Sequence, residues 1–275
     1  MSELKVAERH GRWRVYLDEQ PVAAYSIGYY RPYIYPVLTP AGIPVTEESP
    51  VDHPHHQSIW FGQDKVNGHN LWLNRLGCGR IESKELPPRI IADRAVTFEE
   101  RDHWLAPTGQ ILLTEQRTIT IMPGNVRECP LLIDIESRRA ASSGEARFGC
   151  TKEDGLGVRL HDALDGDDGG VIVNSHGERG EIGTFDQNAE WFDYSGRYGE
   201  HTVGIALFPH PVNPRCPWFT RDCGLIVFNP FRFHEVSLSP GGEIYERYRL
   251  VIHDGDHADA DNVGLYRDYL RDIEG

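Results

Sequence analysis

The stretch ILLTEQRTITIMPGNVRECPLLIDIESRRA, residues 111–140, decides the fold class. Apolar and polar residues alternate through 111–125, and the alternation resumes in 131–140 after a turn bounded by proline. Successive side chains of a strand point to opposite faces, so a period of two residues is typical of a strand with one buried face. Two such strands joined by a short turn predict an antiparallel pair.

The same pattern recurs on both sides of this pair. Residues 11–27 predict a hairpin with its turn at 18–20, and further short strands are expected at 201–210, 224–231, 234–243 and 244–255. The 28 glycines and 18 prolines are spread throughout, which favours turns over crossover helices. We therefore predict an all-β fold, a large antiparallel β-sandwich that forms one domain over residues 1–275.

One helix is expected, at the C-terminal end of the sequence. Asp261 is a plausible N-cap, and helical spacing follows it through residues 262–274. The apolar side chains that this spacing places on one face are Val263, Tyr266, Leu270 and Ile273.

Charge and composition exclude several classes of protein. The 28 basic and 42 acidic residues give a net charge of −14, which disfavours nucleic acid and anionic membranes as partners. No apolar run approaches the roughly 18 residues of a membrane span, and the N-terminal residues do not resemble a signal peptide. The five cysteines form no CxxC pair, which favours reduced thiols. We expect a cytoplasmic protein with a small-molecule partner and no nucleotide cofactor.

Three histidines crowd the segment DHPHHQSIWFG, residues 52–62. In an extended chain His53 and His55 would share one face and His56 the other, although Pro54 favours a loop or a strand entrance. Neutral imidazole is a good ligand for zinc, iron or manganese, and it also titrates near neutral pH. Metal binding and metal-free acid–base chemistry both remain open, as does a loop network in which Asp52 satisfies the histidines.

The segment TKEDGLGVRL, residues 151–160, supplies a second group of charged residues. Lys152 and Glu153 are candidates for a general acid and base, and Arg159 for holding a substrate oxygen. A charged turn before a strand is the alternative, and we prefer it for Asp154. Asn67 is a further candidate, on a turn that its Asn-Gly pair predicts.

Two later segments add candidates for substrate binding. Residues 189–199 offer Trp191 and Asp193, an aromatic face and a carboxylate that suit the faces and hydroxyl edges of a sugar. The proline-rich segment 208–224 carries His210 and Arg221 on a loop that its prolines stiffen. We expect His210 to reach the first histidine cluster from across the sandwich.

Several motifs with their spacing resemble a bacterial family that carries the label methane oxygenase PmoA. The motifs are RPYIYPVLTPAGIPVT, DHPHHQSIWFG, VNG, KEDGLGVRL, WFDYSG, GIALFPHPVNPRCPW and NPF, and they run from about Arg31 to about His253. Gln57 and Gln63 depart from this family's pattern, in which arginine and histidine are commoner at these positions. A particulate methane oxygenase subunit is an integral membrane protein, so the activity in the label is not expected of this sequence.

The C-terminal stretch LSPGGEIYERYRLVIHDG, residues 238–255, resembles the closing hairpin of galactose-mutarotase-like supersandwich proteins. That resemblance implies a carbohydrate bound in a cleft of the sandwich and acid–base catalysis by histidines and a late carboxylate. By this analogy Glu243 is a candidate general base.

The leading hypothesis is an enzyme that carries out elimination, hydration or epimerisation on a sugar or keto-sugar. Its catalytic candidates are His55, His56, Lys152, Glu153 and His210. Its candidates for substrate binding are Arg159, Trp191, Asp193, Arg221 and Asn67. A divalent ion (zinc, manganese or iron) would bind among His53, His55, His56 and His210. The rival hypotheses are a non-catalytic carbohydrate-binding sandwich and a non-haem iron oxygenase.

Overall fold

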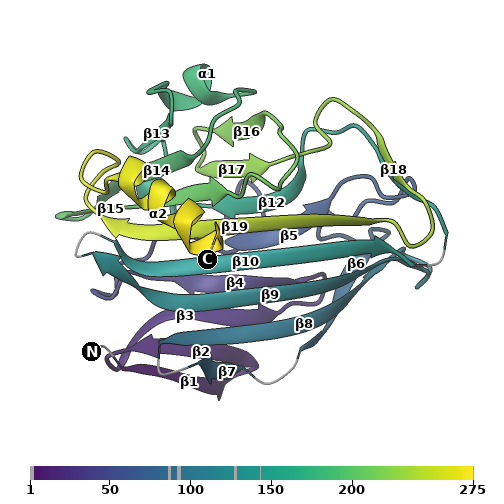
Figure 1. Ribbon diagram of the computed structural model, residues 1–275, viewed down its shortest axis with the longest axis horizontal. Coiled ribbons are helices and arrows are strands. Elements are labelled where there is room, and N and C mark those ends of the chain that lie inside the picture. Colours follow the sequence, from purple (N-terminus) through teal and green to yellow (C-terminus); the bar gives the residue numbers. More distant parts are fainter. Residues whose placement is uncertain (1–2, 86–87, 92–93, 127–128, 143, 275) are drawn as a thin grey trace.

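Two large antiparallel sheets form the molecule (Figure 1), which was analysed as a computed structural model. The structure describes residues 3–85, 88–91, 94–126, 129–142 and 144–274. The predicted all-β sandwich is confirmed. No helix in these described ranges is both long and apolar enough to cross a membrane.

The first sheet has eight strands, and every neighbouring pair is antiparallel. In spatial order they are β1 (Leu4–Arg9), β2 (Arg12–Leu17), β3 (Gln20–Ile27), β4 (Pro32–Val37), β5 (Ile59–Gln63), β12 (Asp154–Arg159), β17 (Leu225–Phe228) and β16 (Trp218–Arg221). The predicted first hairpin is confirmed as β2 and β3. Asp18 and Glu19 form its turn with positive φ angles of 49° and 68°, the geometry that a two-residue hairpin requires.

The second sheet has nine strands and contains the longest ones. In spatial order they are β13 (Val171–Asn174), β14 (Phe192–Tyr198), β15 (His201–Pro209), β19 (Glu243–Asp254), β10 (Cys129–Ala141), β9 (Ile111–Val126), β8 (Ala95–Leu105) and β6 (Arg80–Glu85), with β7 (Arg89–Ile91) beside β8. The stretch that predicted the fold class forms β9 and β10, paired from Leu113 with Ala141 to Val126 with Cys129.

The remaining elements are short, apart from the C-terminal helix. They are a small sheet of β11 (Ala146–Phe148) and β18 (Val236–Leu238), a 3-10 turn η1 (Asp162–Leu164), α1 (Gly180–Thr184) and α2 (Asn262–Glu274).

Helix α2 begins where the sequence predicts, but its buried face differs in part. The Asp261 carboxylate accepts a hydrogen bond from the Gly264 amide at 3.2 Å, which confirms the N-cap. Val263, placed by helical spacing on the apolar face, is 57% exposed. The helix instead packs Tyr269 and the partly buried Tyr266 onto the outer face of the second sheet. Leu270 is half-buried, and the side chain of Ile273 lies outside the described part of the chain.

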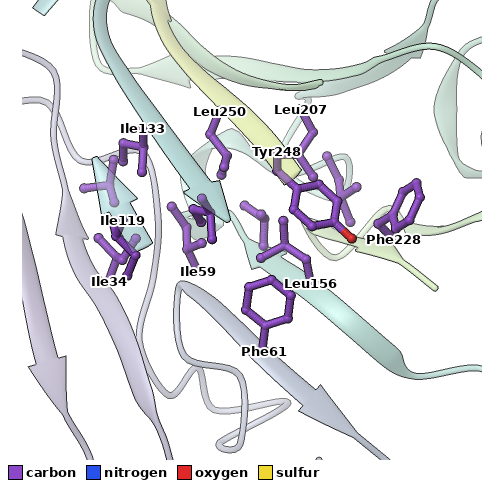
Figure 2. Close-up of a cluster of buried hydrophobic side chains, with 14 of the residues drawn as sticks. Ile34, Ile59, Phe61, Ile119, Ile133, Leu156, Leu207, Phe228, Tyr248 and Leu250 are labelled. Atoms are coloured by element: carbon purple, nitrogen blue, oxygen red, sulfur yellow. The ribbon is translucent and has the colours of Figure 1, made fainter. Parts of the chain in front are cut away.

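The core lies between the two sheets, where the inward residues of each strand interdigitate (Figure 2). The centre of the first sheet shows how alternation divides the strands. Phe61 of β5 and Leu156 of β12 point into the core, whereas Trp60 and Arg159 on the same two strands lie on the opposite face. The candidate site is built on that outer face.

Candidate functional site

Two glycines on the outer face of β5 and β12 leave room for large neighbouring side chains. A Cβ at Gly157 would lie 2.8 Å from the ring of Trp60, and a Cβ at Gly62 would lie 2.8 Å from the ring of Trp72. Both tryptophans are buried, with their ring centroids 5.2 Å apart. The two glycines therefore let a pair of large aromatic rings, tilted by 50° to each other, pack against the sheet and form a floor.

The histidine segment stands on this floor. It is a loop that leads into β5, closed by a hydrogen bond of 2.9 Å from the His56 amide to the His53 carbonyl. The predicted loop is confirmed, and the side chains do not alternate as in a strand. His56 stacks on Trp60 with ring centroids 5.2 Å apart, and His53 stacks on His56 at 4.7 Å with an interplanar angle of 6°. His55 meets His56 edge-on at 4.6 Å.

An arginine and an aspartate orient the outermost histidine. Arg159, buried at the end of β12, donates two hydrogen bonds of 3.0 and 3.1 Å to the two carboxylate oxygens of Asp52. The same carboxylate lies 2.7 Å from Nδ1 of His53. Burial raises the pKa of Asp52, but the hydrogen bonds from Arg159 and His53 outweigh it and lower that pKa to about 2. An ionised carboxylate only accepts, so Nδ1 of His53 carries a proton, and in the neutral imidazole Nε2 holds the lone pair.

The other two histidines are held neutral. Burial lowers the pKa of His55 to about 4, and the proximity of His53 and Arg31 acts in the same direction. Burial also lowers the pKa of His56 to about 2, and the proximity of His55, His53 and Arg159 adds to it. The Nε2 atoms of His55 and His56 are buried and have no hydrogen-bond partner among the described residues. Such atoms are typical of groups that await a ligand, since buried polar atoms are otherwise paired.

The four-histidine metal centre expected from the sequence is not assembled. Parallel stacked rings direct their nitrogen lone pairs along separate planes, so His53 and His56 do not converge on one ion. Candidate ligand atoms of Asp52, His53 and Cys223 do lie within 4.8 Å of one another. Both oxygens of Asp52 are already engaged by Arg159, however, and burial raises the pKa of the Cys223 thiol, which disfavours the thiolate that binds metals.

The structure does not bring His210 to this cluster. Its backbone amide is bound to the Arg247 carbonyl of β19, and its ring lies 6.1 Å from that of Tyr269 on α2. It lines a separate pocket of about 430 Å³ together with His176 and Arg215. The predicted crossing fails because the proline-rich loop that carries His210 is bound to the second sheet, while the histidine cluster stands on the first.

Lys152 and Glu153 also lie away from the cluster. They precede β12, whereas Arg159 ends it, and roughly 20 Å of extended chain separates the two ends. Lys152 is 62% exposed and its ammonium lies 3.8 Å from Glu153. The neighbouring Asp154, for which the sequence favours a charged turn before a strand, is instead the first residue of β12. It is fully buried, and burial raises its pKa to about 8.

The remaining candidates fall into structural positions, with one exception. Trp191 is buried under α2, and Asp193 is buried with His253 2.8 Å away and Asn262 donating to it. Asn67 binds the backbone of the 145–147 segment. Arg221 is the exception. It pairs with Glu181 at 3.2 Å, and its charge acts to lower the pKa of Cys223. Because Cys223 lies beside Asp52 and His53, Arg221 borders the cluster.

Three further sequence expectations concern single residues. Glu243 is an exposed residue of β19 that pairs with Arg138 of the second sheet, and no described contact links it to the histidines. Gln57 is buried beside the cluster with its amide oxygen unpartnered. Gln63 points into the sandwich, opposite Asp154, with both amide atoms unpartnered.

Arg31 is the member of the site that the sequence argument missed. It is 1% exposed, and its Nη2 donates hydrogen bonds of 2.5 Å to the Trp72 carbonyl and 2.6 Å to Oδ1 of Asn74. It contributes to the low pKa of His55, so the two side chains are neighbours. The only available signal was its place at the head of the first family motif, which does not reveal burial.

Comparisons with known proteins place the chain in a family but not in a functional class. Among curated proteins, none matches the sequence. A solved structure, a TPR-domain containing protein from Parabacteroides distasonis, is 10% identical with a TM-score of 0.26; the match covers 92% of this chain and 53% of that one. A TM-score this low supports no argument. Residues 12–267 match the profile described as family of unknown function (DUF6807), and the chain belongs to that family.

Proposed function

We propose that the protein is a carbohydrate-active enzyme that performs acid–base chemistry at the histidine cluster, by elimination, hydration or epimerisation. One observation carries the proposal: Arg159 fixes Asp52, and Asp52 fixes a partly exposed His53, in the relay that orients a catalytic base. His55 and His56 stand beside it as neutral imidazoles with unpartnered nitrogens.

The relay assigns a role to each group. Nε2 of His53 takes a proton from the carbon beside a carbonyl, and the ionised Asp52 stabilises the imidazolium that forms. Arg159 keeps Asp52 ionised and in place. The neutral His55 and His56 polarise the carbonyl oxygen to which the electron pair moves.

His55 is the candidate ligand for a metal ion. Its Nε2 is free and would bind zinc, manganese or iron, whereas Arg159 donates to Nδ1 of His56 at 3.5 Å, so Nε2 of the neutral His56 carries a proton and offers no lone pair. An ion there would supply Lewis-acid polarisation of the carbonyl.

The carbohydrate assignment rests on resemblance as well as on chemistry. The β-sandwich and the C-terminal motif resemble galactose-mutarotase-like proteins, which bind sugars, and such analogy raises the expectation without establishing the substrate. The cytoplasmic location, which the pattern of reduced cysteines predicts, belongs to the same proposal. Cys78, Cys150, Cys216 and Cys223 are free.

A screen of sugars and keto-sugars with three variants tests the proposal. His53→Ala and His53→Gln should each lower kcat by 100- to 10,000-fold, the usual contribution of a general base. His201→Ala, at an exposed histidine of β15, is the matched control and should turn over substrate like the wild type. Full activity in both His53 variants would sink the proposal.

The two rival functions give different results in the same screen. Sugar binding without turnover, unaffected by a chelator, identifies a carbohydrate-binding sandwich. Stoichiometric iron together with oxygen uptake identifies an oxygenase.

A further inference from the structure

Arg31 is a buried positive charge without a negative partner. Five arginines of the described chain are buried, and four of them pair with a carboxylate within 4 Å: Arg117, Arg139, Arg159 and Arg249. Arg31 pairs with none in the described ranges, and its Nε and Nη1 atoms have no hydrogen-bond partner there. A buried charge that lacks a counter-ion costs several kcal/mol, so proteins retain one where a ligand compensates it.

The surroundings of Arg31 are positive, although the protein is acidic. Arg31 and Arg75 both lie near His55, so two cations border it. The carboxylate of the cluster, Asp52, is already paired with Arg159. A chain with a net charge of −14 thus leaves an uncompensated cation at its histidine cluster.

The contacts of Arg31 show where an anion would bind. A Cβ at Gly62 would lie 3.0 Å from Nη1 and 2.8 Å from the Trp72 ring, so this glycine lets Arg31 and Trp72 approach the outer face of β5 together. Asn74 is half-buried, and its neutral Oδ1 is 2.6 Å from Nη2, close to the distance at which a carboxylate oxygen binds a guanidinium. A ligand oxygen that replaces Oδ1 of Asn74 would supply the missing charge.

We infer that Arg31 is the anchor of an anion subsite, and that the substrate is a sugar that carries a carboxylate. This inference rests on the proposed function for the sugar and adds the acidic group. The carboxylate binds Arg31, while the rest of the sugar lies toward His55 and the base His53. Charge-assisted hydrogen bonds of this kind contribute about 1.5–3 kcal/mol, which is roughly a 10- to 100-fold preference.

Calorimetric binding of D-glucuronate and of methyl glucoside, which lacks the carboxylate, tests the inference. Wild type should bind glucuronate at least tenfold more tightly. Arg31→Met should remove that preference, and Arg101→Met, at an exposed arginine of β8, should keep it. Equal affinity for the two sugars, binding of neither, or an unchanged preference in Arg31→Met overturns the inference.

Asn74→Asp gives a second test that does not remove the arginine. It places a carboxylate where the amide oxygen contacts Arg31, so it should raise the melting temperature and abolish the glucuronate preference together. A melting temperature that falls, or a preference that survives, contradicts the assignment even if Arg31→Met does not fold.

The same measurements separate this inference from the proposed function. His53-dependent turnover of neutral sugars without preference for acidic ones removes the anion subsite and leaves the enzyme. Arg31-dependent binding of glucuronate with turnover unchanged in His53→Ala leaves the subsite and removes the catalytic role.

Discussion

The sandwich interior and the histidine cluster both bury charge, but they treat it differently. Inside the sandwich, Arg117 contacts three carboxylates, Glu100 and Asp102 at 3.3 Å and Glu115 at 2.6 Å. On the outer face, Arg31 contacts only neutral oxygens. A buried cation that is paired with carboxylates is typical of a group that the fold itself requires, and an unpaired one of a group kept for a ligand. Burial alone therefore does not separate structure from function, whereas the pairing of the charge does.

The largest effect is expected from an arginine-to-methionine substitution inside the sandwich. Arg117→Met removes the cation that contacts Glu100 and Glu115, while burial and Glu100 raise the pKa of Asp102; the substitution should lower the free energy of unfolding by about 3–5 kcal/mol. Urea unfolding at pH 7.5 measures it. A loss below about 1 kcal/mol would show that the interior network contributes no more than an exposed pair.

The second largest effect is expected at the tryptophan floor of the site, where Gly157 leaves room for the Trp60 ring. Gly157→Ala forces the Trp60 ring to move and should cost about 1–3 kcal/mol, with His56 displaced along with the ring on which it stacks. Gly183→Ala is the control, because the atoms nearest to its Cβ lie 3.6 Å away. Equal free energies of unfolding of the two variants would mean that the Trp60 ring moves without cost.

The third effect is a pH dependence of folding stability that arises in the histidine cluster. Below its unfolded pKa of about 6.5, His56 takes up a proton when unfolded but not when folded, where its pKa is lowered to about 2. Stability is therefore full above pH 6.5 and is lost as the pH falls, by about 1.4 kcal/mol per pH unit from this group. His56→Gln should flatten the loss between pH 6.5 and 4.5 in urea titrations, and a slope identical to wild type argues that His56 is charged in the fold.

The smallest effect is expected where the charge is unbalanced. Arg31→Met leaves no carboxylate unpaired and removes a buried charge that lacks a counter-ion, so the free energy of unfolding should fall by less than about 1 kcal/mol or rise. Comparison of the two single variants Arg31→Met and Arg117→Met separates the effect of charge pairing from that of burial, because both replace a buried arginine by methionine. A loss of stability as large as that of Arg117→Met would mean that Arg31 stabilises the fold and is not kept for a ligand.

The sequence predicts the architecture better than the site. Alternation is local, so it predicts β9, β10 and the first hairpin, and the residue type of Asp261, which is also local, predicts the start of the helix. Which strand lies next to which depends on pairing between distant segments. For this reason His210 and Glu153 were grouped with histidines that the structure keeps apart, and the burial of Asp154 was missed.

The parts of the site that the sequence did reveal share one property. His53, His55 and His56 are adjacent in the chain, so their proximity required no tertiary information. Arg159 joins them only because β12 pairs with β5, a partnership between segments about 100 residues apart. Arg31 joins them through the loop that carries Trp72, for which no residue pattern gave a signal.

The position of β5 has a consequence for motion. This strand is buried along its whole length and is paired with β4 on one side and β12 on the other. Its amides are expected to exchange with deuterated water only when the whole domain unfolds, because no smaller opening exposes them. The floor beneath the histidines is then as rigid as the core. Any adjustment to a ligand falls to the loops above it.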